Sequence, residues 1–198
     1  MYTTDAVLLS VRESGEHDLF ASFFTRDFGK VTAKVRGARK HTTKQGNFLH
    51  SFARARISFI LGKGGALMAG VTSEYEYPAI SQNLIASGYT TSFLSLCDKL
   101  IYEYASDEKL WGAIEAVLVS AESIASSSAD ERQKREALWK EEKMWIIGLL
   151  EVLGLGTSDV RLEGARDKAH LDQYLHAALQ SKCNTPVSFF GMKMGVLL

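Results

Sequence analysis

Hydrophobic and polar residues alternate along most of residues 2–77, with a period of two. The clearest run is 53–61, in which Arg54 and Arg56 stand between apolar residues, and the runs 6–11 and 31–36 show the same alternation. Turns that contain glycine separate the runs, at Gly15, Gly29, Gly37 and Gly62 to Gly65. A period of two bounded by such turns predicts half-buried strands, and we expect five of them.

Five antiparallel strands in so short a segment would leave exposed edges if the sheet stayed flat. Closing the sheet into a small Greek-key barrel removes those edges, and the OB-fold is a five-stranded barrel of this kind. We therefore expect an OB-fold over residues 1–78. Oligonucleotide binding across one face is a common use of this fold, whereas the alternative is a barrel whose lysines only keep the strand edges soluble.

After Pro78 the spacing of apolar residues becomes helical. Ser106 is a candidate cap for the second helix, and Ser128 with Glu131 has the spacing of a capping box for the third. We expect helices over 81–105, 107–124, 128–154 and 167–182, with the Ser- and Ala-rich segment 123–128 as a loop. The fold class is therefore α+β, a barrel domain over 1–78 followed by an all-α, partner-binding domain over 79–198.

The composition predicts a globular cytoplasmic protein without a cofactor. Cys97 and Cys183 are too far apart for a CxxC metal or redox motif, the histidines fall in no metal spacing, and no serine or cysteine pairs recognisably with a base. The N-terminus lacks a signal pattern, and no apolar run approaches the roughly 20 residues that span a bilayer. We expect no catalytic site, no metal and no membrane partner.

The charge is segregated although its sum is zero. Residues 1–63 carry 11 Lys and Arg against five Asp and Glu, which leaves 12 basic and 18 acidic residues for the rest of the chain. Between Asp27 and Glu74 there are nine basic residues and no acidic one. This acid-free segment favours a polyanion such as nucleic acid as the partner of the barrel, because basic side chains bind phosphates whatever the base sequence.

Three ordered motifs indicate a family: Gly15-Glu16-His17-Asp18, Phe24-Thr25-Arg26-Asp27-Phe28-Gly29-Lys30 and Arg36-Gly37-Ala38-Arg39-Lys40. In order and spacing they resemble the N-terminal OB domain of the RecO family of bacterial recombination mediators. Ser81-Gln82-Asn83-Leu84 and the segment 149–156 are similar to RecO helical segments. Many RecO proteins carry four zinc-binding cysteines after that second segment, but residues 160–168 contain none here, so we expect no zinc.

The resemblance implies a non-enzymatic protein that binds single- and double-stranded DNA and anneals complementary strands. It also implies work with RecR and the single-stranded-DNA-binding protein SSB to load RecA. Carried onto matching positions, the expected DNA contacts are Lys30, Lys34, Arg36, Arg39 and Lys40, followed by Arg54 and Arg56 on the fourth strand and Lys44 in a loop. For each of them the alternative is a solvated surface charge. Single-strand binders also stack bases on aromatic rings, and Phe28 and Phe48 are our candidates for exposure.

The partner site is expected in the helical half, around Trp139. An exposed tryptophan with a basic rim suits an acidic peptide with an apolar end, such as the SSB C-terminal tail. The residues of this expected site are Arg132, Arg135, Trp139, Lys140 and Lys143. The alternative is a tryptophan packed in the core with its basic neighbours solvated.

Two other functions are open at this point. A protein-only adaptor would keep the barrel but not bind DNA, and the salt dependence of oligonucleotide binding distinguishes it from a mediator. A nuclease would need clustered acids for a metal, and the segment 28–73 has none.

Overall fold

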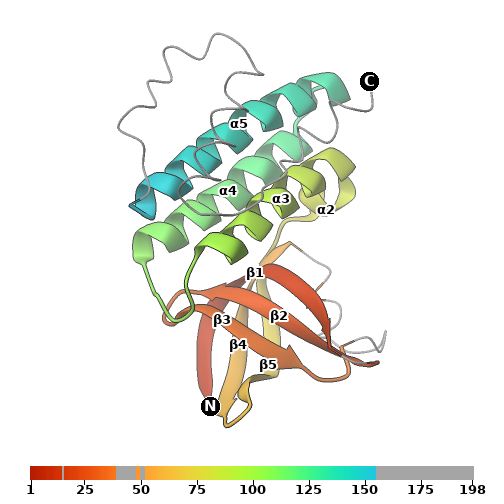
Figure 1. The fold of residues 1–198 in the computed structure, drawn as a ribbon. Coiled ribbons are helices and arrows are strands. Elements are labelled where there is room, and N and C mark those ends of the chain that lie inside the picture. The colour runs from red at the N-terminus through yellow and green to blue at the C-terminus, as the bar shows by residue number, and fades with distance from the viewer. Residues whose placement is uncertain (15, 39–47, 50–51, 155–198) are drawn as a thin grey trace.

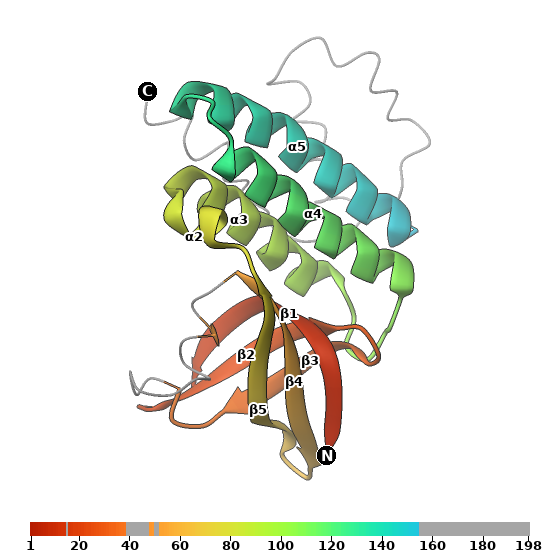
Figure 2. The same ribbon diagram turned by 180° about the vertical axis from the view of Figure 1, so that it is seen from behind.

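The computed structural model describes residues 1–14, 16–38, 48–49 and 52–154. Within these residues a closed barrel is followed by a layer of helices that lie together on one side of it (Figures 1 and 2). This arrangement confirms the α+β class and the five-stranded OB-fold barrel. The helix expected over 167–182 lies outside the described residues.

Five strands form the barrel: β1 (Tyr2–Ser14), β2 (Asp18–Thr25), β3 (Gly29–Val35), β4 (Ala53–Gly62) and β5 (Gly65–Glu76). Their order is β1-β2-β3-β5-β4, and β4 closes back on β1. Every pair is antiparallel except β3 with β5. Alternate residues of each strand point inward, and Phe23, Val31 and Ile57 are completely buried there, so the period of two builds the barrel core as expected.

A bulge in β1 changes which side chains face outward. Leu8 pairs with Phe23 and Ser10 with Ser22, so Leu9 has no partner on β2. The extra residue turns Leu9 and Ser10, although consecutive, to the outer face of the barrel. Leu9 enters the core formed with the helices, and the Ser10 hydroxyl donates to Asp98.

The described helices are α2 (Pro78–Gln82), α3 (Leu84–Leu100), α4 (Glu108–Ser126) and α5 (Glu131–Val152). The single helix expected over 81–105 is instead two, because Asn83 ends α2 and caps α3 by accepting from the Ala86 N–H. Residues 101–107 then run along β3, where the Tyr104 N–H donates to the Lys30 carbonyl.

Two caps differ from the sequence expectation. Asp107 rather than Ser106 caps α4, and a capping box of Asp130 and Gln133 rather than Ser128 and Glu131 opens α5. A carboxylate accepts backbone hydrogen bonds more strongly than a hydroxyl does, which favours both aspartates. The loop expected over 123–128 was wrong as well, because α4 continues to Ser126 and buries Ala125.

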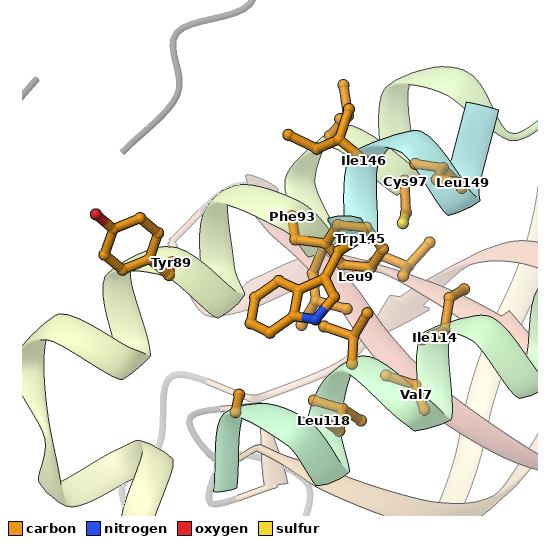
Figure 3. Packing of buried hydrophobic residues seen from close by; sticks show 14 of the residues in the cluster. Val7, Leu9, Tyr89, Phe93, Cys97, Ile114, Leu118, Trp145, Ile146 and Leu149 are labelled. Atoms are coloured by element: carbon orange, nitrogen blue, oxygen red, sulfur yellow. The ribbon is translucent and has the colours of Figure 1, made fainter. Parts of the chain in front are cut away.

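Besides the core inside the barrel, a second hydrophobic core joins the outer face of the barrel to the helices. Val7, Leu9 and Phe24, all on the outer face of the barrel, belong to the same cluster as the buried residues of α3, α4 and α5. Figure 3 shows Val7 and Leu9 among the helical side chains of this cluster. The Phe24 ring also stacks on Trp111, with centroids 6.4 Å apart. Packing is therefore continuous across the boundary at residue 78.

Candidate nucleic-acid interface

The outer face of β1, β2 and β3 carries three rows of side chains, each row joining register partners. The joint row is Val7, Phe24 and Lys30; the serine row is Ser10, Ser22 and Thr32; the open row is Arg12, Phe20 and Lys34. Partners across neighbouring strands lie on the same face, so each row is a line of three adjacent side chains. The rows follow one another along the strands, from the part of the barrel beneath the helices outward.

The helices cover the joint row and the serine row. Asp98 of α3 accepts hydrogen bonds from the hydroxyls of Ser10 (2.7 Å) and Ser22 (2.6 Å). Thr32 donates to Glu103 in the segment that follows α3, at 2.7 Å. Polar side chains in these two rows therefore connect the barrel to α3 and to the segment that follows it.

Asp98 is the polar centre of this joint. Burial alone raises the pKa of its carboxyl, but the hydrogen bonds from Ser22 and Ser10 and the charge of Lys30 outweigh burial and hold the pKa below its usual value. Asp98 is therefore a stable carboxylate that accepts from two strands at once.

Lys30 belongs to the same joint. Its ammonium donates to the Asp98 carbonyl and lies 3.7 Å from the Asp98 carboxylate, and its side chain is only 13% exposed. The sequence predicted a DNA contact at this position, but the structure places the charge under α3.

The open row is the first that the helices leave uncovered. Arg12 is exposed and Phe20 is 39% exposed. Lys34 is 38% exposed and forms an ion pair with Asp18 at 2.9 Å. The Gly37 N–H also donates to Asp18, and this bond together with Lys34 holds the pKa of Asp18 below its usual value. Arg36, just beyond the end of β3, is exposed. The row and Arg36 thus present an aromatic ring among basic groups.

Arg54 and Arg56 lie on the outer face of β4 and hold acids from elsewhere in the chain. Arg54 pairs with Glu115 of α4, and Arg56 pairs with Asp5 of β1 at 2.9 Å. Basic residues of the acid-free segment therefore form ion pairs with acids from other parts of the chain, namely Asp5, Asp18, Asp98 and Glu115. Arg39, Lys40 and Lys44 lie outside the described residues.

Among the described residues, the exposed phenylalanine is Phe20 and neither Phe28 nor Phe48, the two that the sequence suggested. Phe48 is buried and stacks on Phe23, and Phe28 packs against the rings of Tyr2 and Phe59. Phe20 and Arg12 were missed as candidates. The signal for Phe20 was present in the alternation, because Leu19, Ala21 and Phe23 point inward and so leave Phe20 on the outer face.

The comparisons with known proteins agree with this fold. Residues 1–73 match the family described as "Recombination protein O N terminal". The "DNA repair protein RecO" of Geobacter sulfurreducens is 31% identical over 128 residues, which cover 65% of this chain and 53% of that protein. The protein of the same name from Desulfatibacillum aliphaticivorans is 30% identical over 132 residues, covering 65% and 50%. Residues 1–73 thus match the RecO N-terminal domain, and the chain is similar to RecO proteins over about two thirds of its length.

The match has a definite extent. The chain spans about half the length of the curated RecO relatives that it matches. The RecO protein of Geobacter metallireducens, for example, is 26% identical over 115 residues, which are 58% of this chain and 47% of that protein. The matched family region ends at residue 73, so it includes the open row and Arg36 but none of the helices.

In the helical part of the chain, the predicted partner residues follow one stripe of α5. Arg132 is exposed, and Lys140 is exposed and pairs with Glu136 at 2.9 Å. Arg135 and Trp139 are half-buried. Lys143 is 2% exposed, with its ammonium 3.5 Å from Glu142 and 5.6 Å from the centre of the Trp139 ring. The stripe is therefore basic and open at its start but closed at Lys143.

Other chemistry finds little support in the described part of the chain. No three His, Cys, Asp or Glu side chains there are grouped as metal ligands would be, while Cys183 and the segment 160–168 lie outside it. An apolar cleft of about 280 Å³ lies between β1 and α3, and the residues that line it offer hydroxyls but no acid or base. None of the helices that the structure describes is long and apolar enough to cross a bilayer.

Proposed function

We propose that this chain is a non-enzymatic DNA-binding mediator of repair and recombination. In this proposal it binds single- and double-stranded DNA, promotes annealing of complementary strands and, with RecR and SSB, assists RecA loading. Its relatives named "DNA repair protein RecO" support the repair role. The single observation that carries the DNA-binding part is the open row with Arg36, an uncovered basic surface on an OB-fold barrel.

The proposed DNA contacts differ in weight. Arg36 and Lys34 lie at the uncovered end of β3, and Arg39 and Lys40 follow Arg36 closely along the chain, as Lys44 does a little later. Arg56 is exposed enough to share its charge between Asp5 and a phosphate. Arg54 is tied to Glu115, and Lys30 is omitted because its charge lies in the joint. Binding through such groups displaces counterions and does not depend on base sequence.

The test is the salt dependence of oligonucleotide binding by the full chain. The variant Arg36→Ala/Arg39→Ala/Lys40→Ala should bind more weakly, and each lost phosphate contact should lower the slope of log affinity against log salt by ~0.7 for single strands and ~0.9 for duplexes. Arg26→Ala is the control, because it also removes a barrel charge but one that pairs with Glu108. An unchanged slope in a folded triple variant would move the DNA surface elsewhere, whereas no salt-dependent binding by the wild type would favour the protein-only adaptor.

We also propose that the α5 stripe binds the SSB C-terminal tail. The accessible basic groups are those of Arg132, Arg135 and Lys140, and Trp139 offers apolar surface beside them. Acidic residues of the peptide would meet the basic groups while its apolar end packs on the ring. Lys143 acts only from beneath, through its position near the Trp139 ring.

Fluorescence anisotropy of a labelled tail peptide with the full chain tests this second part. Arg132→Ala/Lys140→Ala should weaken binding about 2- to 30-fold at low salt, since each exposed charge is worth ~0.2 to 1 kcal/mol. Lys109→Ala removes an exposed charge from α4 and should have no effect. Equal loss in both variants would show a general charge effect rather than a site on α5.

A further inference from the structure

Phe20 is exposed in a strand that is otherwise covered. The other residues of β2 are buried, apart from the half-buried Asp18 at its start, and Phe20 belongs to neither of the two hydrophobic clusters. At 39% exposure its ring keeps a large apolar surface in water. Exposure of an aromatic ring to water is unfavourable in free energy, and a partner that covers the ring removes this cost.

The two register partners of Phe20 are both basic. Arg12 lies directly opposite on β1 and Lys34 directly opposite on β3, so a positive group stands on each side of the ring. Neighbouring strands are about 4.8 Å apart, which puts both groups within reach of the phosphates that flank a base on the ring. Lys34 is held by an ion pair with Asp18, which lies two residues before Phe20 on β2.

The other exposed aromatic residues of the described chain are Tyr2, Tyr75, Tyr102 and Tyr104, and they lack this setting. Tyr2 packs against Phe28 and Phe59, so its ring is already occupied in part. Tyr75 lies opposite Arg54, but its ring packs edge-on against Tyr77 and Arg54 pairs with Glu115. Tyr102 and Tyr104 are exposed but stand on either side of Glu103, whose charge repels phosphate.

We propose that the ring of Phe20 stacks on an unpaired base, with Arg12 and Lys34 binding the adjacent phosphates. This inference rests on the proposed function and deepens it, because it names the residue that distinguishes single-stranded from double-stranded DNA. An unpaired base offers a free face to the ring, whereas the bases of a duplex are already stacked on each other. Stacking of this kind tolerates any base, because every base has a π-face.

The experiment compares the affinities of single-stranded and duplex oligonucleotides for the full chain. Phe20→Ala should weaken single-strand binding about 5- to 150-fold, the equivalent of ~1 to 3 kcal/mol per stacked base, and leave duplex affinity unchanged. The slope of affinity against salt should stay at the wild-type value, because no charge is removed. Phe20→Tyr should keep most of the affinity.

A matched control and a second probe make the test specific. Ile60→Ala removes a similarly exposed apolar side chain from the outer face of β4 and should not affect either DNA. A strand of the same length without bases should bind the wild type and Phe20→Ala equally. Equal loss of single-strand and duplex binding in Phe20→Ala would show a structural role and overturn the inference. Unchanged single-strand binding would overturn it too, while loss of the salt slope in the Arg36 triple variant would still support the proposed function.

Discussion

The joint row and the open row contain the same pair of residue types in different surroundings. Phe24 on β2 faces Lys30 on β3, and Phe20 on β2 faces Lys34 on β3. Phe24 is fully buried while Phe20 is 39% exposed, and Lys30 is 13% exposed while Lys34 is 38% exposed. Residue type and register are equal in the two pairs, so the cover of the helices is what separates the structural pair from the proposed binding pair.

The largest expected difference between the rows concerns the two phenylalanines. Phe24→Ala removes a buried ring that stacks on Trp111 and should lower the free energy of unfolding by about 3 to 5 kcal/mol. Phe20→Ala removes an exposed ring and should lower it by less than about 1 kcal/mol. Urea denaturation followed by circular dichroism measures both. Similar losses in the two variants would mean that the rows do not differ as described.

The next effect concerns the carboxylate that joins the rows to the helices. Asp98→Asn removes the charge that accepts from Ser10 and Ser22 and pairs with Lys30, and should lower the free energy of unfolding by about 2 to 3 kcal/mol. The control is Glu16→Gln, an exposed acid of the β1–β2 turn, which should change the free energy of unfolding little.

The same carboxylate predicts a dependence on pH. Its pKa is lower in the folded chain than the value of about 3.9 expected when unfolded, so its contribution is present above that value and is lost as the pH falls through the folded-state pKa. Below about pH 4 the stability of the wild type should therefore fall more steeply than that of Asp98→Asn. Parallel curves for the two proteins would contradict the role of Asp98.

The smallest effect on stability is expected for the lysine of the open row. Lys34→Ala breaks an ion pair of half-exposed groups and should change the free energy of unfolding by no more than about 0.5 to 1 kcal/mol, yet it should lower the single-strand salt slope by ~0.7. Lys30→Ala should do the opposite, with a clear loss of stability and an unchanged slope. DNA titrations at several salt concentrations measure the slope, and denaturation curves measure the stability of both variants. A lower slope for Lys30→Ala than for Lys34→Ala would contradict the assignment.

The barrel itself was predictable because alternation depends on neighbours in sequence. Five strands, their closure and the outward position of Phe20 all follow from the period of two. The cover of the barrel was not predictable, because Asp98 and Trp111 reach the outer face from more than 70 residues away. The absence of acids between Asp27 and Glu74 was misleading for the same reason, because folding brings acids from other parts of the chain next to these basic residues.

The helix caps show a second limit of the sequence pattern. Ser128 and Asp130 both have a suitable Glu or Gln three residues later, and only the geometry shows that Asp130 makes the bonds. On α5, the sequence predicted a basic rim around Trp139 that includes Lys143, but it did not reveal that Lys143 is buried.

The core shared by Val7, Leu9 and Phe24 with the helices restricts how such a protein can change during evolution. A barrel whose outer face is entirely polar can recombine with other domains, whereas this barrel without its helices would expose three apolar side chains to water. A chimaera of two relatives joined at residue 78 would have to inherit α3 and α4 from the same parent as β1 and β2. Substitutions on the two sides of this core should therefore accumulate as compensating pairs. Phe20 and its basic neighbours lie outside the core, so substitutions there should not depend on the helices.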